Sequence, residues 1–248
     1  MALIRSILHM AWMLVTIVPW ALTLVVISVW VRRTPLWWFA VNWFRLVIWG
    51  CRVILGIQVR VTGLEHLPQG ATSPAILLSK HQSTLETLLL PTLMPHPLAF
   101  VFKRELLRIP FFGWSMARLD MIHIDRESRA AAMKHVIEQG KAVLAQGTWV
   151  IMFPEGTRIP RGEKGTYQTA GTRLAVESGA PVVPIAVSTG QCWPRDGFTK
   201  YPGVVRVSIG PPIPSVGREP KALMREVEAW IEAEMRRIDP EAYPDAKP

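Results

Sequence analysis

Hydrophobic residues are distributed very unevenly along this chain of 248 residues. The run from Ile7 to Val31 is 25 residues long and has no charge beyond a possible one on His9. As a helix it would rise about 1.5 Å per residue and so exceed the ~30 Å hydrocarbon core of a bilayer. A second apolar run, Leu36 to Gly50, is shorter and contains two polar residues. The pattern predicts a retained N-terminal membrane anchor over residues 1–58, either one span or a two-helix hairpin.

Tryptophan and arginine support this anchor. Seven of the 11 tryptophans lie in the first 50 residues, and tryptophan favours the membrane–water interface. Residues 1–60 contain six arginines and no acidic residue, so they carry +6 of the net charge of +9. The arginines after the first apolar run predict an inner (cytoplasmic) membrane protein whose body faces the cytoplasm. The remaining +3, without a basic stripe interleaved with aromatics, argues against nucleic acid as a partner.

The rest of the chain alternates short apolar runs with helical patterns. The helical period recurs between residues 132 and 144 and between residues 223 and 238. Such alternation predicts an α/β fold, an αβ sandwich with a mixed, largely parallel sheet, over residues 59–248. The six predicted strands are Ala75–Leu78, Leu98–Phe102, Met121–Ile124, Val150–Phe153, Val182–Val187 and Val204–Ile209.

The first candidate for chemistry is His81, which follows the predicted strand Ala75–Leu78. Active-site groups of α/β sheets collect at such strand ends. Ser83 and Glu86 have the spacing of a helix capping box, which gives both residues a structural role. The same helix would also carry the Glu86 carboxylate back toward His81, where it would orient the imidazole as a general base.

Two further clusters follow strands. Phe153 to Arg158 reads Phe-Pro-Glu-Gly-Thr-Arg, a tight turn in which Glu155 and Arg158 can converge with backbone amides, or else an ordinary exposed turn. Lys103 and Arg104 follow another strand and are either a solvated edge or, with Arg158, a site for a dianionic phosphate. The apolar residues from Leu106 to Gly113 then suit either an acyl groove or ordinary core.

Other chemistries lack their motifs. The chain has no Gly-x-Ser-x-Gly elbow, no P-loop, no dinucleotide-binding glycine pattern and no His-Glu-x-x-His. Its two cysteines, Cys51 and Cys192, form neither a disulfide framework nor a metal site. We therefore expect no metal and no cofactor.

Taken together, the clusters resemble the 1-acylglycerol-3-phosphate acyltransferase family of glycerolipid acyltransferases. The resemblance spans roughly residues 64–210, and four blocks occur in the family's order. They are Lys80–Glu86, Lys103–Leu106 continuing through Ile109–Gly113, Phe153–Arg158, and Val183–Ile185.

The resemblance implies that His81 is the catalytic base and that Glu86 orients it. It also implies that the block containing Glu155, Gly156, Thr157 and Arg158 recognises glycerol phosphate. The family's first block usually ends in Asp, so Glu86, one methylene longer, is a departure that must be taken up by rotamer or backbone.

The implied reaction transfers a fatty acyl group from a thioester to a hydroxyl of a lysophospholipid, most simply 1-acylglycerol-3-phosphate. Acyl-CoA or acyl carrier protein would be the co-substrate, and membrane lipids the surroundings. Two alternatives are an acyltransferase for another lysolipid or glycerol-3-phosphate, and a non-catalytic lipid-binding protein.

Overall fold

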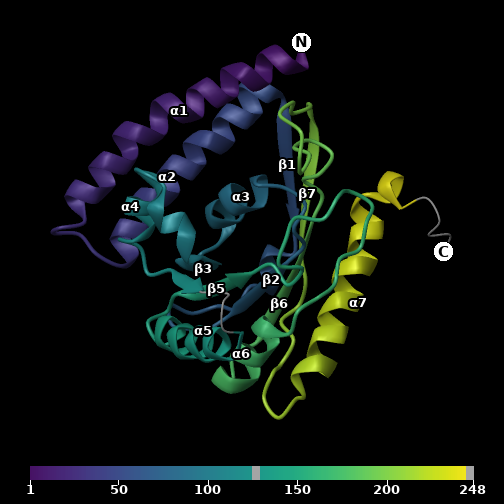
Figure 1. Ribbon diagram of the computed structural model, residues 1–248. Coiled ribbons are helices and arrows are strands. Elements are labelled where there is room, and N and C mark those ends of the chain that lie inside the picture. Colours follow the sequence, from purple (N-terminus) through teal and green to yellow (C-terminus); the bar gives the residue numbers. More distant parts are fainter. Residues whose placement is uncertain (125–128, 244–248) are drawn as a thin grey trace.

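The computed structural model describes residues 1–124 and 129–243, without the side chains of Lys103, Phe112, Ile124 and residues 129–132. Two long helices come first and an α/β unit follows (Figure 1). The helices are α1 (Ala2–Ile27), α2 (Thr34–Gly50), α3 (Leu85–Leu93), α4 (Phe112–Met116), α5 (Arg129–Leu144), α6 (Ala170–Ser178) and α7 (Pro220–Ile238). Shorter helical turns are η1 (Cys51–Leu55), η2 (Leu64–His66), η3 (Arg104–Arg108) and η4 (Pro240–Ala242).

A seven-stranded sheet forms the centre of the molecule, in the order β1-β7-β6-β2-β5-β3-β4. All neighbouring strands are parallel except β6 and β7, which are antiparallel. The predicted mixed, largely parallel sheet is thereby confirmed. The strands are β1 (Ile57–Thr62), β2 (Ile76–Ser79), β3 (Leu98–Lys103), β4 (Ile122–Ile124), β5 (Trp149–Met152), β6 (Val182–Val187) and β7 (Gly203–Ile209).

Both faces of the central strands are buried, because successive side chains of a strand point to opposite sides. Leu77, Ile151 and Ile185 pack on one face with residues of α2 and α3. Ile76 and Leu78 pack on the other face with residues of α5, α6 and α7. The result is a sheet between two helical layers, as Figure 1 shows.

All six predicted strands are present, with ends shifted by no more than one residue. The strand β1 was not predicted, because its polar and apolar residues alternate, unlike the continuous apolar runs of the predicted strands. The predicted boundary between residues 58 and 59 falls inside β1. The N-terminal helical region ends instead at Gly56, whose φ of 74° suits glycine and terminates η1.

The first two helices form the two-helix arrangement rather than a single helix. The stretches Ala2–Ile27 and Thr34–Leu55 are each long and apolar enough to cross a membrane, by length and composition. The second of them is part of the core of the α/β unit, because Trp43, Val47 and Leu55 belong to the same buried cluster as the sheet residues Val205 and Val207. The anchor and the α/β unit therefore share a core.

Helix α1 contacts the α/β unit near both of its ends. Near its N-terminus, the Lys200 amide donates a hydrogen bond to Ser6 Oγ at 2.8 Å. Near its C-terminus, Ala21 and Leu24 line a pocket together with Met116 of α4. Between these ends the helix lies along α2, on the side away from the sheet (Figure 1).

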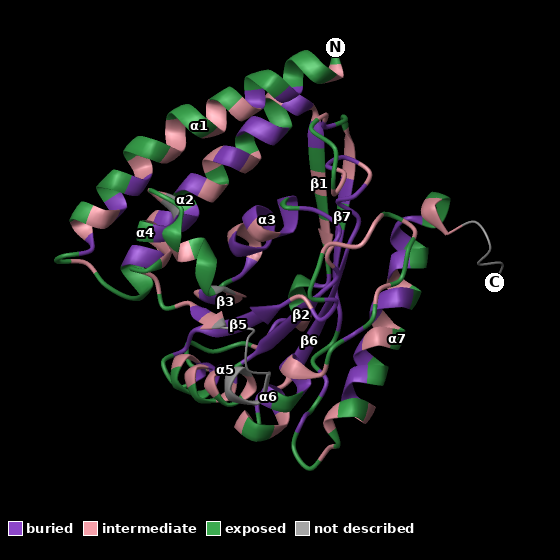
Figure 2. Ribbon diagram, in the orientation of Figure 1, coloured by how far each residue is buried: buried purple, intermediate pink, exposed green. Residues whose placement is uncertain are grey.

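The outer side of α1 is an apolar stripe. Its exposed residues recur at helical spacing along the whole helix, and Figure 2 shows the repeating exposed segments in green. The large exposed members are Leu3, Ile4, Ile7, Leu8, Leu14, Val15, Val18, Leu22 and Val26.

Candidate active site

Parallel pairing of the central strands brings the first and third sequence blocks together. Strand β2 pairs with β5 so that Leu78 lies opposite Met152. Three residues further along each of these two segments, His81 lies opposite Glu155. The two residues are in contact there, since the His81 amide donates a hydrogen bond to Glu155 Oε2 at 3.0 Å.

His81 lies at the carboxyl end of β2 with its ring fixed between two neighbours. The imidazole stacks on Phe153, with ring centroids 3.9 Å apart and an interplanar angle of 17°. Its Nδ1 lies 3.4 Å from Glu86 Oε2, and 15% of the His81 side chain remains exposed. The direction of Nδ1 does not complete a good hydrogen bond to any described residue. Catalytic hydrogen bonds in unliganded sites are commonly long in this way and tighten when substrate binds.

Glu86 is buried at the start of α3, and its carboxylate also lies next to His81. Its carboxylate accepts hydrogen bonds from the amides of Gln82 and Ser83, at 2.9 to 3.0 Å. Ser83 Oγ in turn accepts from the Leu85 amide at 3.1 Å, so the two side chains cap the start of α3. The extra methylene of Glu86 is taken up by folding the side chain back over its own helix end, next to His81.

Thr189 is a site residue that the sequence reasoning missed. It follows β6, which is parallel to β2 on the side opposite β5, and its hydroxyl donates to Glu86 Oε1. The next amide, Gly190 N, donates to Gln82 Oε1 at 3.1 Å. The rule that functional groups collect at the carboxyl ends of parallel strands applied equally to Val182–Val187 and would have indicated Thr189.

Glu155 does not have the surroundings expected of a direct substrate contact. Its side chain has no exposed surface, and Oε1 lies 2.7 Å from Lys80 Nζ. The Gly165 amide also donates to Oε1, at 3.2 Å, while Oε2 accepts from the His81 amide. A substrate cannot reach this carboxylate without displacing those partners. Its contacts order the loop that carries His81.

The remainder of the third block faces solvent. Gly156 is exposed and has φ of 67°, a left-handed conformation that favours glycine. Thr157 is also exposed. Arg158 is half-buried and donates through Nη1 to Thr84 Oγ1 at 3.2 Å and to the Arg195 carbonyl at 3.0 Å. The adjacent Ile159 amide donates to the His81 carbonyl at 2.7 Å, so Arg158 lies beside the loop of the histidine.

The second block begins at the same edge of the sheet, where β3 ends. Strand β3 is parallel to β5, and Lys103 is its last residue, but the Lys103 side chain lies outside the described part of the structure. Arg104 is exposed at the start of η3. Its charge contributes, after burial and His135, to lowering the pKa of His123.

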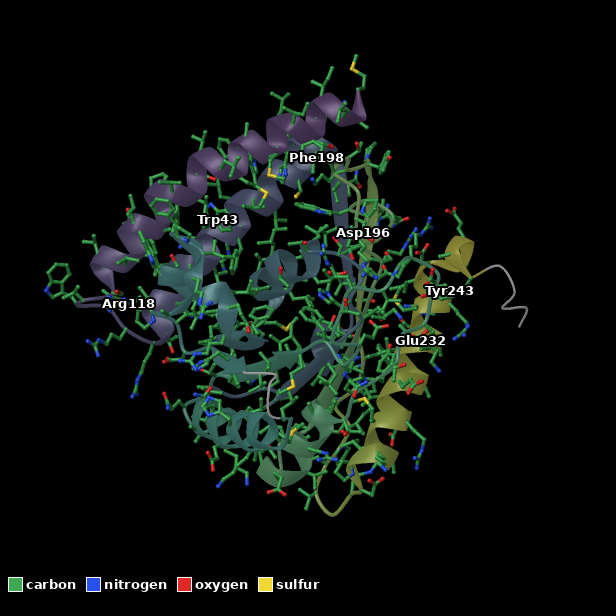
Figure 3. The ribbon with its side chains drawn as sticks, viewed as in Figure 1. Trp43, Arg118, Asp196, Phe198, Glu232 and Tyr243 are labelled. Carbon is green, nitrogen blue, oxygen red and sulfur yellow. The ribbon has the colours of Figure 1, made fainter. Side chains whose placement is uncertain are left out.

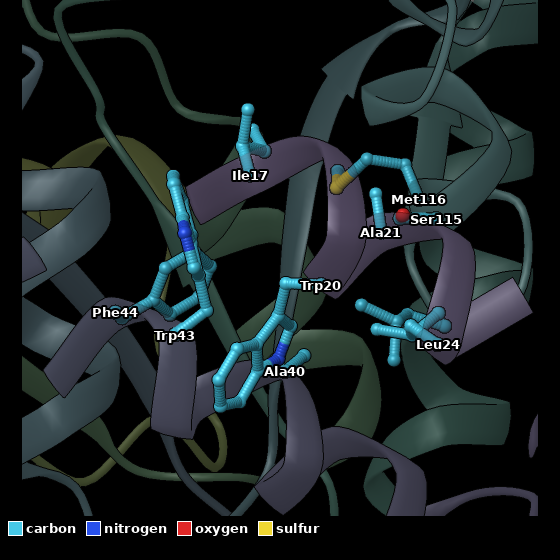
Figure 4. Close-up of a pocket in the computed structure, with 10 residues that line it drawn as sticks. Ile17, Trp20, Ala21, Leu24, Ala40, Trp43, Phe44, Ser115 and Met116 are labelled. Carbon is cyan, nitrogen blue, oxygen red and sulfur yellow. The ribbon is translucent and has the colours of Figure 1, made fainter. Parts of the chain in front are cut away.

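An apolar pocket lies between the N-terminal helices and α4 (Figure 4). Trp20 and Trp43 form part of its wall, and Ser115 brings a hydroxyl oxygen to its lining. The stretch after Arg104 that was considered for an acyl groove does not line it, and Leu106 and Ile109 of that stretch are exposed. The lining residues are Ile17, Trp20, Ala21, Leu24, Ala40, Trp43, Phe44, Ser115, Met116 and Leu119.

Comparison with known proteins assigns the family. Residues 58–188 match the sequence model of the family described as Acyltransferase. The chain belongs to this acyltransferase family. It is 48% identical over 202 residues to the 1-acyl-sn-glycerol-3-phosphate acyltransferase of Pseudomonas aeruginosa, covering 80% of this chain and 77% of that protein. It is 32% identical over 179 residues to the human 1-acyl-sn-glycerol-3-phosphate acyltransferase alpha, covering 71% of this chain and 62% of that one.

A solved structure supports the same assignment. The crystal structure of the 1-acyl-sn-glycerophosphate acyltransferase from Thermotoga maritima matches this acyltransferase with a TM-score of 0.79 at 25% identity, over 96% of this chain and 95% of that one. The predicted family, fold and enzyme class are thereby confirmed. The family match ends at residue 188, so Thr189 and all of α7 fall outside the matched part of this acyltransferase.

Proposed function

We propose that this acyltransferase moves a fatty acyl group from acyl-CoA or acyl-acyl carrier protein to the free hydroxyl of 1-acylglycerol-3-phosphate, which yields phosphatidic acid. The observation that carries the proposal is the position of His81, at a strand end, 3.4 Å from a buried carboxylate and partly open to solvent. The names of the relatives from Pseudomonas aeruginosa and human support the acceptor.

The reaction proceeds by direct transfer with His81 as general base. With Nδ1 turned toward Glu86, the other ring nitrogen, Nε2, is left to take the proton of the acceptor hydroxyl. The acceptor oxygen attacks the thioester carbonyl, the carbon–sulfur bond breaks, and the thiol leaves with a proton from the imidazolium. Glu86 stabilises the imidazolium between these two proton transfers.

Arg158 is the residue we assign to the acceptor's phosphate. Its guanidinium lies beside the His81 loop and presently donates to one neutral hydroxyl and one carbonyl, so it has donors left for an anion. A guanidinium binds phosphate through two parallel hydrogen bonds. Lys103 and Arg104, at the neighbouring strand end, add positive charge to the same edge. In the exposed turn the Gly156 amide already donates to the Phe153 carbonyl at 2.9 Å, so we assign the Thr157 amide to the phosphate.

We propose that the N-terminal helices attach the enzyme to the membrane by entering one leaflet. A helix crossing the bilayer would leave one end far from a domain on the other side, whereas both ends of α1 contact the α/β unit. The outer apolar stripe of α1 would face the acyl chains. The six exposed arginines of residues 1–60 would meet anionic head groups on the cytoplasmic side of the inner membrane.

The test is an assay of the full-length protein in mixed micelles with both thioester donors and a panel of lysolipids and glycerol-3-phosphate. We expect 1-acylglycerol-3-phosphate to be the preferred acceptor and His81→Ala to lower turnover by ~10² or more, the scale of general-base catalysis. His135→Ala, a half-buried histidine on α5, is the control and should keep wild-type activity.

Three results would redirect the assignment. Preference for another acceptor would show that the physiological acceptor is not 1-acylglycerol-3-phosphate. Full activity of His81→Ala would exclude the proposed base. Lipid binding without any turnover, for every donor and acceptor pair, would favour a non-catalytic lipid-binding protein.

A further inference from the structure

A buried ionic network lies directly behind the catalytic loop. Its centre is Lys80, the residue before His81, whose side chain has no exposed surface. The Lys80 ammonium donates to Glu155 Oε1 at 2.7 Å, to Glu232 Oε1 at 2.9 Å and to the Glu163 carbonyl at 3.1 Å. An ammonium has three donors, and these three contacts use all of them.

Glu232 joins this network from the C-terminal helix α7 (Figure 3). Its side chain is 5% exposed, and Oε1 also accepts a hydrogen bond from the Tyr167 hydroxyl at 2.8 Å. Burial, reinforced by the nearby charges of Glu155 and Glu232, raises the pKa of Tyr167, so the hydroxyl stays protonated and acts as the donor. Oε2 of Glu232 has no hydrogen-bond partner among the described residues.

Burying a carboxylate such as that of Glu232 costs hydration free energy, so its position in the core calls for a compensating partner. A buried carboxylate stabilises a protein only when its partners offset the loss of hydration, and an apolar residue of similar volume is often equally good. The helix neighbours of Glu232 are apolar, since Ile231 and Met235 belong to the core beneath the sheet. The buried partner that accounts for a carboxylate at this helix position is the Lys80 ammonium.

A short chain of contacts connects Glu232 to His81. Glu232 holds the Lys80 ammonium from the α7 side, and the ammonium holds Glu155 Oε1. The other oxygen of Glu155 accepts from the His81 amide at 3.0 Å. Two carboxylates from distant parts of the sequence thus share one cation adjacent to the base.

We propose that Glu232 is a positioning residue for the catalytic histidine, acting through Lys80 and Glu155, with Tyr167 fixing the Glu232 carboxylate. This inference rests on the proposed function of His81 and extends the reaction machinery to α7, beyond the matched family region of residues 58–188. Glu232 touches no reacting atom. It sets the direction of the loop from which the imidazole reaches the substrate.

The experiment measures kcat, both KM values and the thermal midpoint of full-length variants in mixed micelles. Glu232→Ala is expected to lower kcat by about 10- to 100-fold with little change in either KM, because displacing a catalytic group by a fraction of an ångström costs rate. Glu232→Gln keeps an oxygen that accepts from Lys80 and Tyr167 and should retain most of kcat. Tyr167→Phe should lower kcat by a few-fold.

A matched control separates positioning from stability. Ile231→Ala removes buried atoms from the same helix without touching the network, so its thermal midpoint should fall while kcat below that midpoint stays at wild type. In a His81→Ala background, Glu232→Ala should add no further loss, because no base remains to be positioned.

The outcomes distinguish this proposal from the proposed function. Wild-type kcat in folded Glu232→Ala, while His81→Ala is inactive, would overturn the role of Glu232 alone. Wild-type activity in His81→Ala would overturn the proposed base. If Glu232→Ala does not fold, unchanged kcat in Tyr167→Phe overturns the positioning role.

Discussion

The imidazole of His81 lies flat against the ring of Phe153, with centroids 3.9 Å apart. Phe153 is the last residue before the turn of the third block, and His81 follows the neighbouring strand, so parallel pairing of β2 and β5 creates the stack. The ring limits rotation of the imidazole about its side-chain bonds. It thereby maintains the orientation in which Nδ1 faces Glu86.

Replacing Phe153 by Leu keeps an apolar contact but removes the flat surface. Aromatic pairs contribute about 0.5–1.5 kcal/mol beyond their burial, so we expect kcat to fall by roughly 2- to 10-fold. Both KM values should remain close to wild type. The control is Phe100→Leu. The Phe100 ring packs beside Phe153 but not on His81, so this substitution should change only the thermal midpoint.

Glu86→Gln tests the carboxylate beside the base. The Gln82 and Ser83 amides and the Thr189 hydroxyl all donate to this side chain, and an amide nitrogen cannot accept from them. We expect kcat to fall by about 10²-fold, the scale of lost general-base assistance. Glu86→Asp keeps the charge and should lose less.

The same substitution at another helix start provides the control for Glu86. Glu219 caps α7 by accepting from the Lys221 and Ala222 amides, far from any catalytic group. Glu219→Gln should lower the thermal midpoint slightly and leave kcat unchanged. Equal kcat values for Glu86→Gln and Glu219→Gln would reduce Glu86 to a helix cap.

Arg158→Lys separates phosphate recognition from chemistry. Lysine keeps the charge but loses the two-pronged donor, and charge-assisted hydrogen bonds contribute about 1.5–3 kcal/mol. The acceptor KM should therefore rise by about 10-fold or more, while the donor KM hardly moves. Arg173→Lys, exposed on α6, is the control. A collapse of turnover with both KM values unchanged would assign Arg158 to the oxyanion or to the scaffold.

The thiols should be inert in the folded protein. Cys192 is 1% exposed, and burial, its largest influence, raises its pKa to about 11, so at pH 8 the reactive thiolate is scarce. Cys51 is buried as well. An aromatic disulfide reagent should react with both thiols only after denaturation. Rapid reaction of one thiol in the native protein, abolished in Cys192→Ser, would contradict this expectation.

The shared core predicts what truncation does. Removing residues 1–56 strips Trp43, Val47 and Leu55 from the buried cluster that covers one face of the sheet. We expect the truncated chain to aggregate rather than to remain as a soluble domain, as measured by gel filtration. The full chain should resist extraction by carbonate and yield to detergent. A monomeric, folded truncated protein would show that the helices are separable.

The sequence predicted the strands well because each central strand is an unbroken apolar run. It also showed that the first and third blocks each follow such a run, and the parallel pairing of β2 and β5 brings the two blocks together. It did not predict β1, where Gln58 and Arg60 alternate with apolar residues at an edge of the sheet.

Roles that depend on burial were harder to predict. Glu155 and Arg158 are three residues apart in one block, yet one is enclosed and the other is half-buried. Glu232 is one of four acidic residues on α7, and the other three, Glu226, Glu228 and Glu234, are exposed or half-buried. Distances across the sheet, such as that between Lys80 and Glu232, follow from tertiary packing that a linear pattern does not contain.

The common core of α2 and β7 also sets an order on biosynthesis. A ribosome completes α1 and α2 well before it reaches Val205 and Val207, the sheet residues that bury Trp43 and Val47. During that interval the inward side of α2 has no partner, while the outward stripe of α1 is already able to enter lipid. With the membrane attachment proposed above, insertion would precede closure of the core, and the active site would form only after the chain had reached the membrane.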